Sequence, residues 1–278
     1  MIFLLLAILS SAMVSVTMRL STGRISNNVG MLAMNYLMCM AVAGALTGFG
    51  NLLPMGPTLG QTLAMGGFNG VLYLLSFVLL QLNVKKNGVV LSATFMKLGL
   101  LVPMVISVLF FREMPTAGQM AGFCIAVGAI LLINLEKGSS VVGFKLGLIL
   151  LLLGGGGADA MSKVYEELGD PELSEQFLFY TFAVAFVLCI ALMLGKKQRI
   201  GKGELLFGLL IGVPNYFSSY FLLRALEDVP AVIAYPSYSV ATIFAVTVVG
   251  VLAFRERLGR CQWLALGIIL AALVLLNT

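Results

Sequence analysis

Two oppositely charged residues, Lys97 and Asp159, stand inside long apolar stretches of the sequence. Charge is costly in hydrocarbon, so an ionisable residue inside a membrane span marks an ion or substrate pathway by default. Lys97 could bind a carboxylate or a phosphate, and Asp159 an amine or a proton. We hypothesise that both face a shared cavity and pair, and that substrate or proton binding competes for the pair. The alternatives are a permanent structural ion pair and no contact at all.

Asn, Tyr and Ser side chains also interrupt the apolar stretches, where each amide or hydroxyl group must find a partner. This requirement directs them toward the interior of a helix bundle. The alternatives are hydrogen bonds between helices and, for Tyr235 and Tyr238, anchoring at the membrane surface. With Lys97 and Asp159, the predicted substrate-binding residues are Asn35, Tyr36, Asn69, Tyr73, Asn215, Tyr216, Ser219, Tyr220, Tyr235 and Tyr238.

Three basic residues, Arg19, Lys163 and Arg224, lie near the ends of apolar stretches. Long basic side chains at such positions can snorkel to the membrane surface, and this is the favoured interpretation for all three. Arg19 and Lys163 match when the chain is shifted by 144 residues. The pair is therefore also a candidate gate, or a contact for an anionic substrate.

Catalytic chemistry has little support in the sequence. The chain has no histidine, which removes His-based general bases and most zinc sites. Its four cysteines stand singly, without metal-ligand or redox spacing, and are expected to be core residues. No P-loop motif is present. We expect no catalytic residue, no metal and no cofactor, and we exclude an ATP-driven pump within this chain.

The composition indicates that these residues lie in a lipid membrane rather than in water. Of 278 residues, 60% are hydrophobic and 10% are charged, against about 25% charged in soluble domains. This excludes soluble, disordered and nucleic-acid-binding proteins. A spanning helix needs about 20 apolar residues. The sequence therefore predicts an all-α polytopic membrane protein with ten transmembrane helices, at 2–20, 29–48, 59–82, 88–110, 117–135, 144–164, 174–195, 203–225, 231–254 and 260–277.

The first stretch, 2–20, lacks a basic flank, so we expect a retained helix rather than a cleaved signal peptide.

Glycines mark several positions where two helices are expected to approach closely. Gly66 and Gly70, and Gly208 and Gly212, have the spacing of tight helix pairs. The run 154–157 is all glycine, although each Gly weakens a helix by about 1 kcal/mol relative to Ala. This glycine run indicates a hinge, a very close crossing of two helices, or backbone exposed to a cavity.

The chain also repeats itself. A shift of 143 residues aligns 59–134 with 202–277 without a gap, and Phe111-Arg112-Glu113 then meets Phe254-Arg255-Glu256. Both Arg-Glu pairs are expected to form ion pairs or caps at exposed span ends, which contribute little. Each half holds five spans, an odd number, so the second half must enter the membrane upside down. The predicted domains are two inverted five-helix repeats, 1–136 and 144–278.

On these features the chain resembles the drug/metabolite transporter superfamily, EamA-like family. The matching features are ten spans in two halves, an Arg-Glu pair ending spans four and nine and followed by Gln119 or Gln262, and a basic residue ending spans one and six. The resemblance implies a secondary carrier of small metabolites, often an exporter. One departure is Ser10-Ser11, where family members carry an aromatic-Gly pair in the first span.

The predicted function is a secondary active transporter that exports a small polar or amphipathic metabolite by alternating access. An amino-acid-like solute fits, because a zwitterion could use both Lys97 and Asp159; proton coupling through Asp159 is a further hypothesis. The expected partners are the small-molecule substrate and the lipid bilayer, with no nucleic acid, in a monomer or homodimer spanning the cytoplasmic (inner) membrane. The alternatives are a membrane-embedded enzyme acting on a lipid or isoprenoid substrate, and an ion channel.

The charge pattern predicts an orientation. Loops after odd-numbered spans hold an excess of Lys and Arg, and such loops are typically cytoplasmic. Both termini would then lie outside, whereas the family resemblance implies that both lie inside. The basic residues in and beside these loops after odd-numbered spans are Arg24, Lys85, Lys86, Lys137, Lys145, Lys196, Lys197, Arg199, Lys202, Arg255, Arg257 and Arg260.

A reporter that is active only in the cytoplasm, fused after Thr278, is expected to be inactive, because the charge asymmetry places this terminus outside. A reporter that is active only outside the cytoplasm, fused at the same residue, should give the reciprocal result. Activity of the cytoplasmic reporter would overturn this orientation.

Overall fold

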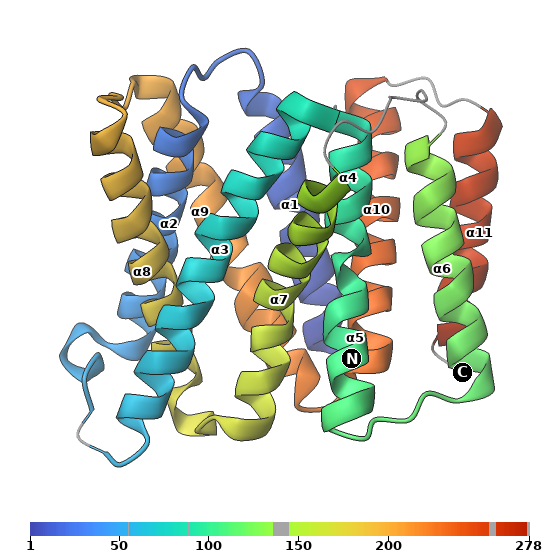
Figure 1. Ribbon diagram of the computed structural model, residues 1–278, viewed down its shortest axis with the longest axis horizontal. Helices are drawn as coiled ribbons and strands as arrows, with labels where there is room; N and C mark the ends of the chain where they lie inside the picture. The colour runs from blue at the N-terminus through green and yellow to red at the C-terminus, as the bar shows by residue number, and fades with distance from the viewer. Residues whose placement is uncertain (55, 88, 136–144, 256–259, 277–278) are drawn as a thin grey trace. The chain divides into compact units, whose positions relative to one another are not determined.

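The computed structural model describes residues 1–54, 56–87, 89–135, 145–255 and 260–276. Four residues used above, Lys137, Glu256, Arg257 and Thr278, lie outside these ranges. Within them every regular element is an α-helix or a short 3-10 helix (Figure 1). In chain order they are α1 (Ile2–Ser21), α2 (Asn28–Thr47), η1 (Phe49–Asn51), α3 (Leu59–Asn87), α4 (Val89–Lys97), η2 (Leu98–Leu100), α5 (Leu101–Phe110), α6 (Ala117–Leu135), α7 (Lys145–Leu168), η3 (Pro171–Leu173), α8 (Ser174–Gly195), α9 (Lys202–Leu226), α10 (Ala231–Phe254) and α11 (Arg260–Leu276).

These elements match the ten predicted spans one to one when α4, η2 and α5 are taken as one interrupted helix. Among the described residues, seven segments are long and apolar enough to cross a membrane, namely α1, α2, α3, α7, η3 with α8, α9 and α10. The interrupted helix, α6 and α11 supply shorter apolar segments. The prediction of an all-helical multi-pass membrane protein is confirmed. Two helices run further than expected, since α3 continues to Asn87 and α7 to Leu168.

The chain forms two compact units, and each is described by itself. The first unit contains Met1, Leu75–Lys163 and Leu226–Thr278, and the second contains Ile2–Leu74 and Val164–Ala225. Each unit takes helices from both halves of the sequence. The predicted domains, 1–136 and 144–278, divide the chain by its internal repeat, whereas the two units divide it by compactness. The two repeat domains stay a prediction.

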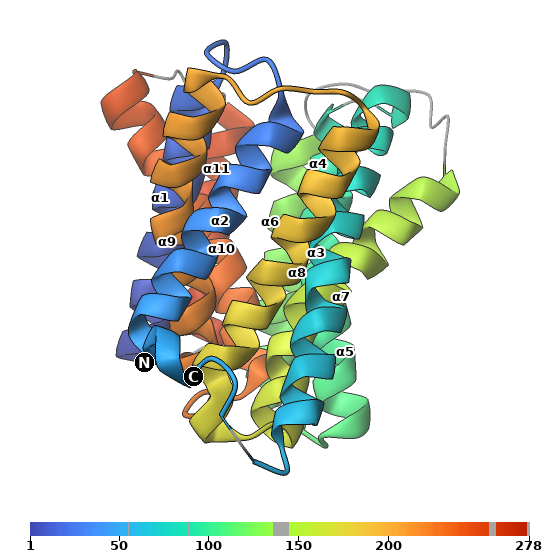
Figure 2. The same ribbon diagram turned by 90° about the vertical axis from the view of Figure 1, so that its left-hand side faces the viewer.

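In the second unit, α2 packs along α8 (Figure 2). Their apolar faces share one buried cluster that includes Ala33, Phe182 and Ala185. The paired glycines bring α3 against α8 and α9 against α2, as their spacing predicts. A Cβ would lie too close to a backbone oxygen at each of them: 2.8 Å from Phe177 at Gly66, 2.5 Å from Thr181 at Gly70, 2.6 Å from Met31 at Gly208 and 2.7 Å from Asn35 at Gly212.

In the first unit, α6 packs along α11, and α10 contacts α5, α6 and α11 (Figure 1). The fourth span and α7 meet backbone to backbone. A Cβ on Gly156 would lie 2.2 Å from the Gly99 oxygen, and a Cβ on Gly99 would lie 3.0 Å from the Gly156 nitrogen. Gly99 sits within η2, where the fourth span is interrupted. Of the three interpretations of the glycine run, a very close crossing is confirmed at Gly156.

Gly156→Ala is expected to lower the free energy of unfolding by about 1–3 kcal/mol, because the new methyl group must push a backbone oxygen aside. Gly155→Ala is the matched control, since its nearest atom beyond the local helix is Met96 Cγ at 4.0 Å. There the gain in helix propensity should leave stability equal or higher. Thermal unfolding of the purified variants in detergent compares them, and a Gly156→Ala variant as stable as Gly155→Ala would contradict the tight crossing.

Candidate functional site

The predicted substrate-binding residues divide between the two units. The first unit holds the charged residues Lys97, Asp159 and Lys163 together with Tyr235 and Tyr238. The second unit holds Asn and Tyr side chains from α2, α3 and α9, with Arg19 at the end of α1. The members of this second group are Arg19, Asn35, Tyr36, Asn69, Tyr73, Asn215, Tyr216, Ser219 and Tyr220.

The crossing of Gly99 and Gly156 brings Lys97 toward Asp159. Lys97 ends α4, two residues before Gly99, and Asp159 lies on α7 about one turn after Gly156. The two side chains are close enough to interact electrostatically. Both keep accessible surface. The two charges therefore lie within electrostatic range of each other on two helices that cross, and both side chains are accessible.

Tyr235 fixes the backbone beside Asp159. Its hydroxyl donates a hydrogen bond of 2.8 Å to the Asp159 carbonyl oxygen, and the residue is 1% exposed. This contact ties α10 to α7 at the level of the acidic side chain. Tyr235 is thus a bundle residue rather than a surface anchor. Tyr238, about one turn further along α10, is partly buried.

Lys163 lies one turn beyond Asp159 on α7 and forms an ion pair with Glu113. The Lys163 Nζ and Glu113 Oε1 atoms are 2.8 Å apart, and the two side chains are 3% and 16% exposed. The other carboxylate oxygen accepts a hydrogen bond of 3.3 Å from the Val232 amide at the start of α10. The Phe111 ring lies 5.7 Å from Nζ. Glu113 therefore joins the end of the fourth span to α7 and α10.

These contacts correct two expectations. Lys163 does not snorkel to the surface, because Glu113 offers a partner within the protein. The Arg112-Glu113 pair was expected to form ion pairs or caps, and Glu113 does both. The expectation that it would be exposed and contribute little is wrong for Glu113, whose partner is buried.

A polar network joins α2 to α9 in the second unit. Asn215 Nδ2 donates to Asn35 Oδ1 at 3.3 Å and contacts Cys39 Sγ at 3.6 Å. Cys39 Sγ in turn contacts the Gly212 carbonyl oxygen at 3.2 Å. These groups satisfy one another and hold the two helices in register. Sequence reasoning missed Cys39, although its position one turn after Asn35 is a signal of a shared face.

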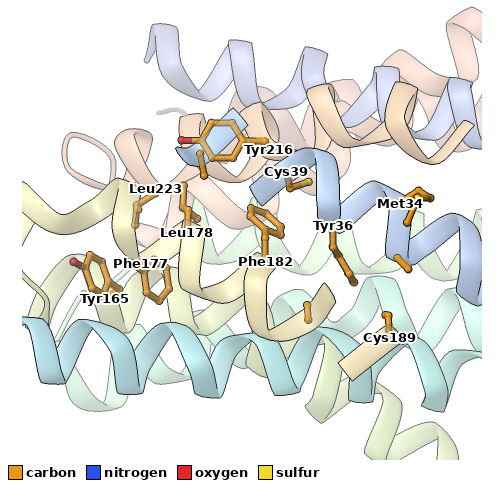
Figure 3. Packing of buried hydrophobic residues seen from close by; sticks show 13 residues of the cluster. Met34, Tyr36, Cys39, Tyr165, Phe177, Leu178, Phe182, Cys189, Tyr216 and Leu223 are labelled. Atoms are coloured by element: carbon orange, nitrogen blue, oxygen red, sulfur yellow. The ribbon is translucent and has the colours of Figure 1, made fainter. Parts of the chain in front are cut away.

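Beside this network lies a group of rings that we name the aromatic cluster: Tyr36, Tyr73, Phe182, Tyr216 and Tyr220. Neighbouring ring centroids are 5.8–6.2 Å apart along Tyr36–Tyr73–Phe182–Tyr216–Tyr220. Figure 3 shows Tyr36, Phe182 and Tyr216 on the helices that meet there. The structure thus brings together four predicted residues, and the Tyr73 hydroxyl also contacts Ser219 Oγ at 3.4 Å. Phe182 was missed, because a Phe in an apolar stretch carries no signal of its own.

The remaining basic residues lie at the edge of the second unit. Arg19 is exposed at the end of α1, as a snorkelling side chain would be. Arg224 is partly buried, and its guanidinium lies 5.6 Å from the Tyr220 ring centroid, in cation–π range. Arg19 and Lys163 fall in different units, so their role as a gate stays a prediction. Within the described ranges, no group of three His, Cys, Asp or Glu residues could hold a metal ion.

Three comparisons define the class of this protein. A crystal structure superposes with a TM-score of 0.75, covering 99% of this chain and 94% of its own at 15% identity, which shows a shared fold. A Haemophilus influenzae protein described as an uncharacterized protein is 28% identical over 203 residues, which cover 71% of this chain and 69% of the relative. The sequence model of the EamA-like transporter family matches residues 145–278.

The apolar helices therefore define a multi-pass membrane protein, and its C-terminal part is similar to the transporters of one family. Residues 145–278 match the model of the EamA-like transporter family, within the drug/metabolite transporter superfamily. Members of this family are transporters and generally not enzymes. The resemblance recognised in the sequence is confirmed.

Glu113→Gln is expected to lower the free energy of unfolding by about 3–5 kcal/mol, because it leaves a buried ammonium without a counter-charge. The glutamine can still accept from Val232, so the change isolates the lost charge. Adding Lys163→Met should recover most of the stability, since no buried charge then remains. Thermal unfolding of both variants in detergent checks this. A Glu113→Gln variant that melts like the unmodified protein would show that the pair does not stabilise the fold.

Proposed function

We propose that this protein is a secondary active transporter that exports a small polar or amphipathic metabolite, such as an amino-acid-like solute, across the cytoplasmic (inner) membrane. One observation carries the proposal. Lys97 and Asp159 hold opposite charges within electrostatic range inside the helical region, and both keep accessible surface. In a chain of a transporter family, such a pair is a suitable site for a solute.

The chemistry of the pair favours a zwitterion. A solute carboxylate can take the place of Asp159 beside Lys97, while its ammonium group takes the place of Lys97 beside Asp159. Each protein charge then keeps an opposite partner throughout binding. This matters because an uncompensated charge at low dielectric is strongly destabilising. A solute with a single charge would leave one member of the pair without compensation.

Alternating access between inverted repeats, 1–136 and 144–278, is the mechanism that we propose for transport. Packing between matched spans supports it, since α2 packs on α8 and α6 on α11. A backbone feature supports it as well. Arg112 and Arg255 occupy the same repeat position, and both adopt a left-handed conformation, with φ of 57° and 53°. Non-glycine residues rarely do so, which makes the coincidence informative.

A reciprocal contact gives further support. Glu204 Oε1, at the start of α9, accepts hydrogen bonds from the Ser26 and Asn27 amides, at 2.7 and 3.0 Å, in the turn after span one. The 143-residue shift matches Glu204 with Gln61. Gln61 Nε2 donates to the Leu168 oxygen at 2.8 Å, at the end of span six. In each half, the start of the third span thus contacts the other half at the end of its first span or in the turn that follows that span.

Asp159 is our candidate for proton coupling. Protonation would remove its attraction for Lys97 and for a solute ammonium together, so proton and solute would compete for one carboxylate. We expect the small-molecule solute and the surrounding bilayer to be the partners of the chain, which functions as a monomer or homodimer.

Uptake of radiolabelled amino acids into proteoliposomes, with and without an imposed pH gradient, tests the function. We expect saturable uptake that depends on the gradient. Asp159→Asn should abolish the gradient dependence and lower the initial rate about tenfold, equivalent to about 1.4 kcal/mol. Asp228→Asn, at an exposed acid in the turn between α9 and α10, is the control and should transport normally.

An Asp159→Asn variant with unchanged rate and pH dependence would rule out the coupling role. Currents that rise with solute concentration without saturating would favour an ion channel. Turnover of an added lipid without solute movement would favour the membrane-enzyme alternative.

A further inference from the structure

Three buried side-chain oxygen atoms of the second unit have no hydrogen-bond partner among the described residues. They are Gln176 Oε1 on α8, Asn69 Oδ1 on α3 and the Tyr216 hydroxyl on α9. Asn69 and Tyr216 are the most deeply buried of the three residues, at 1% and 0% exposed. Folded proteins pair nearly all such atoms, and an exception points to a water, an ion or a ligand that belongs there. The penalty is greater inside a membrane protein, where lipid offers no hydrogen bonds.

The Asn69 and Tyr216 atoms border the aromatic cluster. The Tyr216 ring lies 6.2 Å from Phe182 and 5.9 Å from Tyr220. Asn69 lies one turn before Tyr73 on α3, so both residues share a helix face, and the Tyr73 ring lies 5.8 Å from Phe182. Tyr216 is thus a member of the cluster, and Asn69 lies one turn from another member, Tyr73.

The residues of the cluster and Ser219 beside it differ in exposure. Tyr36 and Tyr216 are buried, whereas Tyr73, Ser219 and Tyr220 keep accessible surface. At these accessible residues the Tyr73 hydroxyl and Ser219 Oγ are 3.4 Å apart, beyond the usual range for hydroxyl hydrogen bonds. A ligand that entered here would displace a weak contact. The Asn35–Asn215–Cys39 network, whose members already bond to one another, would be left intact.

The chemistry of these groups specifies the ligand. Asn69 Oδ1 only accepts hydrogen bonds and so requires a donor such as N–H, while the Tyr216 hydroxyl can donate and requires an acceptor. Tyr and Phe rings favour a planar π system that stacks on them or meets them edge to face. A heteroaromatic ring with one N–H and one unprotonated nitrogen meets all three requirements.

We propose that the aromatic cluster binds a planar heteroaromatic ring of the azole or purine type. The ring donates its N–H to Asn69 Oδ1 and accepts a hydrogen bond from the Tyr216 hydroxyl through its second nitrogen. This inference goes beyond the proposed function, because it assigns a ligand site to the second unit by itself.

Equilibrium dialysis of the purified full-length protein in detergent against radiolabelled benzimidazole tests the site. Benzimidazole carries one N–H and one acceptor nitrogen, 1-methylbenzimidazole lacks the N–H, and indane lacks both. We expect saturable binding of benzimidazole, binding of the methylated probe about tenfold weaker, as the loss of one hydrogen bond implies, and weaker binding still of indane.

Two variants assign the hydrogen bonds. Asn69→Leu should bind benzimidazole and its methylated form equally, and Tyr216→Phe should weaken both about tenfold. Each change removes an unpartnered atom, so neither should lower the melting temperature. Tyr165→Phe is the matched control, because Tyr165 is a buried tyrosine of the same hydrophobic core whose hydroxyl already donates to the Asp170 oxygen at 2.8 Å. It should bind all three probes as the unmodified protein does.

Absence of saturable benzimidazole binding at millimolar concentration would overturn the proposal, as would equal binding of the methylated probe to the unmodified protein. Undiminished binding by the Asn69→Leu/Tyr216→Phe double variant would overturn it as well. Dialysis requires no gradient, so its outcome is separate from that of transport. Probe binding without any uptake into proteoliposomes would contradict the transporter and keep the ring site, and uptake without probe binding would do the reverse.

Discussion

The backbone contact between Gly99 and Gly156 determines the arrangement of the first unit. Side chains at this crossing would hold α7 away from the fourth span, and the glycines let the two backbones touch. The interruption of the fourth span at η2 falls at the same place, so the helical break and the glycine run are two sides of one contact. Lys97 and Asp159 flank this crossing on either helix. The crossing thus brings the two charged residues into electrostatic range of each other.

Helix α7 contributes one residue to each of two cation–carboxylate pairs among the described residues of the first unit. Lys163 pairs with Glu113, and Asp159 interacts with Lys97. The two pairs differ in how far they are exposed to solvent. Lys163 and Glu113 are largely removed from solvent, and the free carboxylate oxygen bonds to the start of α10. This pair fixes three helical segments, and a solute cannot replace either member without leaving a buried charge. Lys97 and Asp159 interact electrostatically but keep accessible surface. One turn along α7 therefore separates a largely buried pair from a pair that keeps accessible surface.

The sequence predicted the elements of this fold better than their contacts. The ten spans follow from apolar stretches of membrane length, and nearly all their limits agree within a residue or two, because the apolar–polar boundary is a local property. Paired glycines likewise predicted the tight contacts of α3 and α9. The burial of Lys163, the hydrogen-bonding role of Cys39 and the position of Phe182 depend on residues far away in the chain. No local pattern distinguishes a Phe that joins an aromatic cluster from one that faces lipid.

Polar groups are scarce in this chain, and whether a buried polar group has a hydrogen-bond partner indicates its role. Asn35, Cys39 and Asn215 bond to one another and fasten α2 to α9. Asn69 Oδ1 and the Tyr216 hydroxyl lie close by, equally buried, without a partner among the described residues. Had these two served only to join helices, a Leu and a Phe would have packed as well without the desolvation penalty. Their retention in a hydrophobic interior is explained if another molecule completes their hydrogen bonds, as the proposed ring ligand would.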